Sequence, residues 1–242
     1  MGSKKRRVDG NPAEGCRRRG DAMELFEALY TTRAMRRMSA REVPDELIPR
    51  VLDAAIRAPS GGGFQNWCFI VIRDPTMKAY LGELFREDVA AARRGRYRPL
   101  EEAIGRGERS ERLDAHAAFV RSMLHLVEHF AEVPVCIAPL IQSGENTIWP
   151  GGSIYPAVWS LQLAARACGL GSVPVGSLAR HQAEILPRLG VPDDGWMLAS
   201  IVALGYPTGR WGVAPRRPAH DVTFLERWGQ RPAWTVPKPL WP

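Results

Sequence analysis

The chain has 242 residues, of which 45% are hydrophobic and 24% charged, as is ordinary for a globular protein. No apolar run approaches the roughly 18 residues of a membrane span, so we expect a soluble protein with no membrane partner. The four cysteines lie far apart and form no C-x-x-C pair, which argues against a zinc site and a disulfide framework. Cys68 and Cys136 lie in predicted strands and are expected to be small buried apolar residues. A reducing, cytoplasmic location fits this pattern.

The net charge of +7 is concentrated in residues 1–22, which hold seven Lys or Arg residues against three acidic ones. This stretch has almost no large apolar side chains, so we expect a disordered basic tail. It is interpreted as a solvated extension, or as sequence upstream of a start at Met23. A nucleic-acid-binding arm is a further interpretation, but no aromatic stacking pattern or motif accompanies the charge, so nucleic acid is not expected as the main partner.

Hydrophobic periodicity predicts one domain over 23–242. Helices are expected at 23–30, 44–56, 114–131, 153–169 and 183–189, and strands at 68–73, 133–141 and 197–204. Ser153 is predicted to cap the long fourth helix. The stretch 78–113 has weak periodicity and indicates an exposed, mobile excursion on helical pieces. The C-terminal extension 222–242 carries tryptophans among prolines. Such aromatic side chains need a surface to pack against, and a partner subunit is a natural candidate.

Residues 58–73 are the most informative stretch. A helix is expected to stop at Pro59, and a buried strand begins at Trp67 after Ser60–Gly63. Glycine has no Cβ, so backbone N–H groups there can approach a planar or anionic ligand closely. The side-chain amides of Gln65 and Asn66 can donate to and accept from a heterocycle. The stretch therefore predicts a ligand-binding loop.

Two groups of arginines are candidates for holding a phosphate, because the planar guanidinium fork matches phosphate oxygens. They are Arg33, Arg36 and Arg37 after the first helix, and Arg216 and Arg217 near the C-terminus. Each group alone is read more simply as solvated surface. Their order along the chain, with 58–63 and 173–176 between them, makes the set informative.

Other chemistry-bearing patterns are incomplete. His125 and His129 match H-x-x-E-H and could share a metal, but no third ligand follows, so an ordinary amphipathic helix and no metal site are predicted. There is no Gly-Lys-Ser/Thr loop and no G-x-G-x-x-G after a strand, which excludes a Walker loop and a Rossmann fingerprint. No G-x-S-x-G elbow accompanies His181 or His220, so a serine hydrolase is set aside.

Taken in order, these motifs resemble the flavin-dependent nitroreductase family over about residues 23–229. The motifs that carry the resemblance are Thr32-Arg33-Ala34-Met35-Arg36, Val43-Pro44-Asp45-Glu46-Leu47, Ala58-Pro59-Ser60-Gly61, Gln65-Asn66-Trp67, 153–157, 163–171, 203–207 and 215–218. Three positions depart from the family pattern: Ala34 replaces a serine, Gly63 an asparagine, and Asn66 a proline. Flavin tuning is therefore left open.

The resemblance implies an α+β, nitroreductase-like fold, in which helices flank a central mixed or antiparallel sheet. It also implies an intertwined homodimer with one FMN at each end of the interface. Transferred position by position, the residues toward the phosphate and ribityl chain are Arg33, Ala34, Met35, Arg36, Arg37, Arg216 and Arg217. The residues around the flavin ring are Pro59, Ser60, Gly61 and Gln65, contributed by the same subunit or by its partner. Pro174, Val175 and Gly176 would lie beside N5 of the flavin. Tyr97, Trp149 and Tyr155 are candidates for the substrate face, and packing is an equally good interpretation of them.

The implied activity is NAD(P)H-dependent reduction of a small electron acceptor, such as a nitroaromatic or a quinone, by ping-pong hydride transfer. The flavin carries the chemistry, and no side chain need act as acid or base. The same fold also serves substrate oxidation, reductive dehalogenation and flavin cleavage in other members, so these reactions stay open.

Overall fold

The structure, a computed structural model, describes residues 23–143 and 148–238. The predicted basic tail at 1–22 and the last four residues of the predicted C-terminal extension lie outside the described residues.

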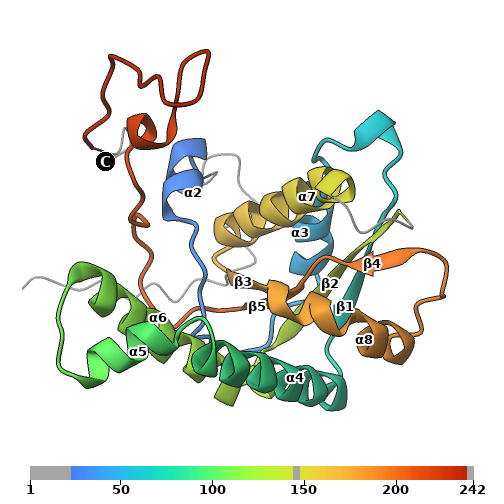
Figure 1. Cartoon of the computed structure of the whole chain (residues 1–242). Helices are drawn as coiled ribbons and strands as arrows, with labels where there is room; N and C mark the ends of the chain where they lie inside the picture. The colour runs from blue at the N-terminus through green and yellow to red at the C-terminus, as the bar shows by residue number, and fades with distance from the viewer. Residues whose placement is uncertain (1–22, 144–147, 239–242) are drawn as a thin grey trace, which may run out of the picture.

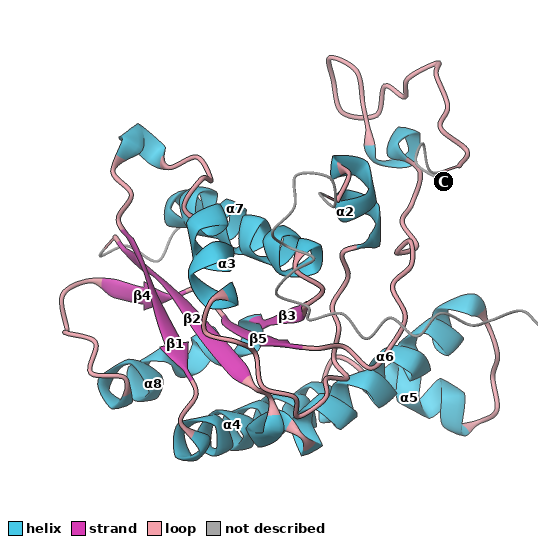
Figure 2. Cartoon of the chain, turned by 180° about the vertical axis from the view of Figure 1, so that it is seen from behind, coloured by secondary structure: helices cyan, strands magenta, loops and turns pink. Residues whose placement is uncertain are grey.

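Within the described residues, five strands form one sheet, and every strand pair is antiparallel (Figures 1 and 2). The strands are β1 (Trp67–Ile72), β2 (Val135–Gln142), β3 (Gly171–Val175), β4 (Trp196–Leu198) and β5 (Ile201–Gly205). The order is β1-β2-β5-β3, with β4 also paired to β2. The predicted central strand at 133–141 is confirmed, since β2 is buried over seven of its eight residues.

The predicted strand at 197–204 is instead two short strands separated by a β-bulge. Leu198 pairs with Leu140 and Val202 pairs with Ile137, so four residue steps on β4–β5 face three on β2. Pro139 lies in β2 at this point and has no N–H to donate to a ladder. Proline inside a sheet is tolerated at such bulges, which gives the break a physical reason.

Helices cover both faces of the sheet. One face carries α4 (Pro75–Arg94), α6 (Glu111–Glu128), η3 (Phe130–Glu132), η4 (Gly176–His181) and α8 (Gln182–Arg188), which share a core cluster with it. The other face carries α3 (Leu47–Ala55) and α7 (Ile148–Ala167). The shorter α2 (Leu25–Thr31) packs against α7, α5 (Arg98–Gly105) packs against α4 and α6, and η5 (Ala219–Val222) is the one helical turn after β5 within the described residues.

The segment 78–113 is less exposed than its composition predicts. Its first part, 78–94, belongs to α4, where Leu81, Leu84, Phe85 and Val89 are buried at helical spacing against the sheet. Lys78 is also buried, and its Nζ donates to the Val133 carbonyl at 2.8 Å. The prediction of an exposed excursion is wrong for this helix, because the abundant Arg, Glu and Ala residues hide its apolar stripe.

The cysteines show how strand position decides burial. Cys136 on the central strand is buried as predicted, and burial raises the pKa of its thiol to about 12. The thiol is therefore protonated and unreactive near neutral pH. Cys68, predicted to be buried as well, is exposed because β1 is an edge strand.

The segment that carries the first arginines is held against the end of the sheet. The Met35 N–H donates to the Ser172 carbonyl at 3.0 Å, and the Ser39 N–H donates to the Tyr206 carbonyl at 2.9 Å. A Cβ added to Gly171 would lie 2.8 Å from the Met35 Cβ. Glycine at position 171 is thus needed for the segment to approach β3 this closely.

We expect Gly171→Ala to lower the free energy of unfolding by about 1–3 kcal/mol, because the added methyl forces Met35 or β3 to shift. Chemical denaturation measures the change. Gly212→Ala is the matched control, since a Cβ there meets no atom of the described residues within 4 Å. The effect of the control should stay within about 0.5 kcal/mol. Equal effects of the two substitutions would contradict the close approach.

Candidate functional site

Two segments remote in sequence run side by side in opposite directions at one end of the molecule. The Thr208 N–H donates to the Arg37 carbonyl at 3.0 Å, and the Ala214 N–H donates to the Tyr30 carbonyl at 3.3 Å. Figures 1 and 2 show the chain after α2 descending toward α6 next to the C-terminal segment. We call residues 30–39 the arginine segment and residues 208–214 the C-terminal segment.

The arginine segment gathers positive charge at this end of the sheet. Arg33 and Arg37 are exposed, whereas Arg36 is half-buried, with its Cζ 5.0 Å from the Phe119 ring centroid and its Nη1 3.5 Å from the Ser122 hydroxyl oxygen. Burial first, and then the charge of Arg33, lower the pKa of the Arg36 guanidinium. Since the two cations repel each other, an anion placed between them would be stabilised.

The edge strand β3 lies beside the arginine segment. Ala34 forms a parallel bridge with Ser172, and Met35 is buried beside it. From Ser172 to Val175, its last residue, the strand spans roughly 10 Å at about 3.3 Å per residue. Pro174 and Gly176 are exposed and Val175 is buried. Arg33 and Arg36 therefore lie on either side of the residues bound to β3, the strand whose C-terminal end carries the exposed Pro174.

The glycine loop lies elsewhere. We use this name for residues 58–66. Its Gly61 N–H donates to the Ser153 hydroxyl at 3.0 Å, and its Gln65 N–H donates to the Ser60 hydroxyl at 3.0 Å. Gly62, Gly63 and Gln65 have positive φ, so the loop is a compact turn rather than a simple link. The exposed Pro59 precedes the turn, and α3 already ends at Ala55 rather than at Pro59.

Ser153 does not cap a helix as predicted. Helix α7 begins at Ile148, so Ser153 lies inside it and uses its hydroxyl to hold the glycine loop. The sequence hides this role, because a serine ahead of an apolar helical stripe is read as an N-cap. The helix does end as predicted, with Gly169 at φ +75° just beyond its last turn.

Helix α7 separates the two halves of the predicted site. Ser153 at the glycine loop and Arg166 at the arginine segment lie thirteen residues apart, which corresponds to about 20 Å along the helix. The sheet also keeps the glycine loop and the arginine segment apart. Trp67, just after the loop, pairs with Ile141 at one end of β2, whereas Leu204, near the arginine segment, pairs with Val135 at the other end. Figure 1 shows α2 and the loop before β1 at opposite ends of α7.

The candidate substrate residues divide in the same way. Tyr97 packs edge-on against His116 at 5.1 Å and Phe119 at 5.9 Å between ring centroids, and lines a cavity of about 280 Å³ with Ser177, next to Gly176. Trp149 and Tyr155 are exposed on the first half of α7, close to the glycine loop. Tyr97 thus belongs with the arginine segment, and the other two belong with the loop.

The C-terminal arginines lie against α2. Arg216 and Arg217 are exposed and line a cavity of about 720 Å³ together with Leu29, Trp159 and Lys238. This position adds positive charge beyond Tyr30, on the α2 side of the arginine segment rather than along the edge of β3.

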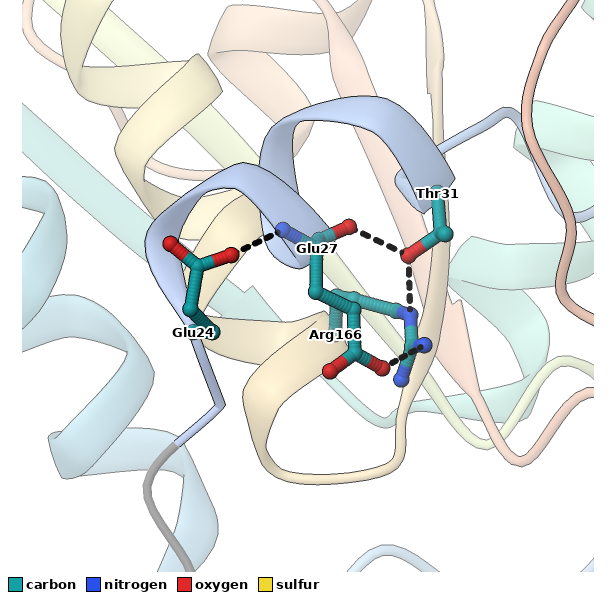
Figure 3. Close-up of polar contacts among 4 residues, drawn as sticks. All are labelled: Glu24, Glu27, Thr31 and Arg166. Atoms are coloured by element: carbon teal, nitrogen blue, oxygen red, sulfur yellow. Dashed lines mark hydrogen bonds and ion pairs between the residues drawn. The ribbon is translucent and has the colours of Figure 1, made fainter. Parts of the chain in front are cut away.

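Arg166 is a connecting residue that the sequence did not single out. Its Nε donates to the Thr31 hydroxyl oxygen at 3.2 Å, and its Nη2 donates to a Glu27 carboxylate oxygen at 3.3 Å (Figure 3). Its Cζ also lies 4.2 Å from the Trp211 ring centroid. A basic residue in a last helical turn is normally read as a complement to the helix dipole, so no sequence signal distinguishes it.

No group of three or more His, Cys, Asp and Glu residues in 23–143 and 148–238 could hold a metal ion. The His125 and His129 rings lie 4.4 Å apart, and His129 Nδ1 lies 3.0 Å from a Glu132 carboxylate oxygen. Burial first, and then Arg37, lower the pKa of His125. Over the same described ranges, none of the helices is long and apolar enough to cross a membrane.

We expect Ser153→Ala to loosen the glycine loop, because the Gly61 N–H loses its acceptor. The free energy of unfolding should fall by about 1 kcal/mol, and amide hydrogen exchange should rise at residues 58–66. Ser160→Ala on the same helix is the control, since Ser160 lies two turns further along α7, away from the loop. If exchange in the loop is unchanged, this hydrogen bond does not hold it.

Comparisons with known proteins place the chain in a family. The model of the family described as Nitroreductase matches residues 29–206. A protein of Methanothermobacter thermautotrophicus, named as a putative NADH dehydrogenase/NAD(P)H nitroreductase, is 42% identical over 210 residues, covering 85% of this chain and 88% of that protein. Mouse (Mus musculus) iodotyrosine deiodinase 1 is 39% identical over only 67 residues, covering 28% of this chain and 24% of the deiodinase.

A solved structure agrees with this placement. A point mutant of an FMN- and NADPH-dependent nitroreductase from Sphigopyxis sp. strain HMH superposes with a TM-score of 0.62 at 22% identity, covering 85% of this chain and all of the other. This likeness confirms the predicted fold class. The matches together confirm the predicted family and its oxidoreductase class: the chain belongs to the nitroreductase family.

Proposed function

We propose that the protein is an FMN-dependent oxidoreductase that uses NAD(P)H to reduce a small electron-poor acceptor, such as a nitroaromatic or a quinone. The observation that carries the proposal is the bridge between Ala34 and Ser172, which holds Arg33 and Arg36 beside β3, the strand that leads into the exposed Pro174 and Gly176. Family membership and the FMN- and NADPH-dependent relative support it.

The residues present fit a flavin mononucleotide. Arg33 and Arg36 repel each other, and a dianionic phosphate between them would offset that repulsion. Just after β3, Gly176 has no side chain to keep a planar ring from the backbone. Bound FMN would supply the hydride-transfer chemistry, while the chain binds, orients and shields the reactants.

We further propose that the site is completed by a second copy of this chain. Apolar side chains are exposed at the α2 end, where Leu25 and Phe26 are 61% and 53% exposed, and on the C-terminal extension, where Trp228 is 90% exposed. Such a surface is typical of a protein interface. A homodimer would cover it and would bring a partner's glycine loop, with Trp149 and Tyr155, to the arginine segment.

A different redox reaction on the same cofactor is the second candidate. The 67 residues that match the deiodinase favour reductive dehalogenation over substrate oxidation and flavin cleavage. The match covers too little of either protein to replace the first proposal, and the choice of acceptor decides between them.

We also propose a cytoplasmic location, in which residues 1–22 are a solvated extension of one catalytic domain. Among the described cysteines, Cys68 and Cys136 are free thiols, as is usual in a reducing compartment.

The purified protein should bind FMN, and both Arg33→Gln and Arg36→Gln should raise its Kd about 10- to 100-fold, the value of one charge-assisted hydrogen bond. Fluorescence titration of the apoprotein measures this change. Arg86→Gln is the control, because Arg86 pairs with Glu83 on α4, outside both the arginine segment and the glycine loop. A protein that binds no FMN would end the proposal.

The acceptor is then identified with the FMN-loaded protein. Anaerobic addition of NADH or NADPH should bleach the flavin absorbance, and a nitroaromatic or a quinone should restore it. Restoration by a halogenated phenol alone would select the second candidate. If neither nicotinamide bleaches the flavin, the proposed electron donor is wrong.

Dimer formation has its own test. Phe26→Asp places a charge on the exposed face of α2, so we expect a shift from dimer to monomer in sedimentation and a loss of FMN affinity. Val71→Asp is the control, because Val71 is exposed on the opposite edge strand β1. A wild-type monomer that binds FMN normally would contradict the shared site.

A further inference from the structure

Arg166 connects three parts of the fold with one buried side chain. It lies in the last turn of α7 and is 8% exposed. Its guanidinium reaches Glu27 and Thr31 on α2 and stacks on Trp211 of the C-terminal segment. Burying a guanidinium this far requires good partners, so this arrangement is specific.

The α2 contacts lie directly before the arginine segment. Thr31 is the last residue of α2 and is 5% exposed, and Arg33 follows two residues later. The Thr31 hydroxyl also donates to the Glu27 carbonyl at 2.7 Å, while the Glu24 carboxylate accepts from the Glu27 N–H at 3.0 Å (Figure 3). Arg166 therefore fixes the end of α2 and the direction in which the chain leaves it.

The stacking contact fixes the other side of the arginine segment. The C-terminal segment is hydrogen-bonded to the arginine segment at Thr208 and again at Ala214. Trp211 lies midway between these two bonds and packs on the Arg166 guanidinium. One cation thus links α7 to both neighbouring segments at the level of Arg33.

We propose that Arg166 is a positioning residue that holds the end of α2 and the Trp211 segment so that Arg33 and Arg36 converge on the flavin phosphate. This inference rests on the proposed function. Arg166 acts through the arginine segment and touches no reacting atom. Its loss should weaken binding of the phosphate and leave binding of the ring unchanged.

A comparison of FMN with riboflavin, which lacks the phosphate, tests this role. In apoprotein titrations, Arg166→Gln should raise the Kd for FMN about tenfold, since each displaced arginine loses a charge-assisted hydrogen bond. The Kd for riboflavin should stay the same. Arg166→Lys keeps the charge without the planar stack, so its Kd for FMN should lie between those of the wild type and Arg166→Gln. Trp211→Leu should raise the Kd for FMN as Arg166→Gln does.

Arg73→Gln is the matched control. Arg73 also ties segments together, because its Nη2 donates to the Val43 carbonyl at 2.9 Å and to an Asp45 carboxylate oxygen at 2.8 Å, near the end of β1. Its loss should lower stability without changing the ratio of the two affinities. If Arg166→Gln is too unstable to purify, Arg166→Lys and Trp211→Leu decide the question.

The outcomes are separable. If Arg166→Gln weakens the binding of FMN and of riboflavin equally, or changes neither affinity, the positioning role is wrong while the proposed function stands. If the wild-type protein binds neither ligand, the proposed function fails and this role fails with it. A loss confined to FMN supports both.

Discussion

The site depends on the fixed length of α7 and on the contact that each of its ends makes. Near its start, Ser153 accepts from the Gly61 N–H; in its last turn, Arg166 holds α2 and Trp211. Between them, Ala157, Leu161 and Ala165 are fully buried in the core between helices and sheet. Since this core packs α7 against the sheet between the two contacts, the glycine loop and the arginine segment are held about 20 Å apart.

This separation is the reason for proposing a second copy of the chain. In that proposal, a loop with exposed glycines and an edge strand flanked by guanidiniums are each half of one ligand site. Each half lies beside exposed apolar side chains, such as Phe64 at the loop and Phe26 on α2. In the proposed homodimer, the same contact that covers these side chains would join the halves, so cofactor binding and association would stabilise each other.

The sequence predicts the elements well where local periodicity matches burial. β2 and α8 follow their patterns closely, and Gly169 ends α7 as expected. Prediction from the sequence fails where tertiary contacts decide the structure. The bulge at Pro139 depends on two strands pairing with β2, and the apolar stripe of α4 is hidden among charged residues. The roles of Ser153 and Arg166 had no signal, because each depends on a partner more than ninety residues away.

Ala34 shows how the departures from the family pattern bear on the site. Backbone contacts hold this part of the segment, through the bridge to Ser172 and the Met35 hydrogen bond, so it keeps its place without a hydroxyl at this position. A hydroxyl would have added a directional contact to a phosphate. Without it, the proposed grip on the phosphate comes from the guanidiniums, and their placement matters correspondingly more. Arg33 is exposed and screened by salt, whereas the half-buried Arg36 is screened less, so Arg36 should carry the larger share of the binding energy.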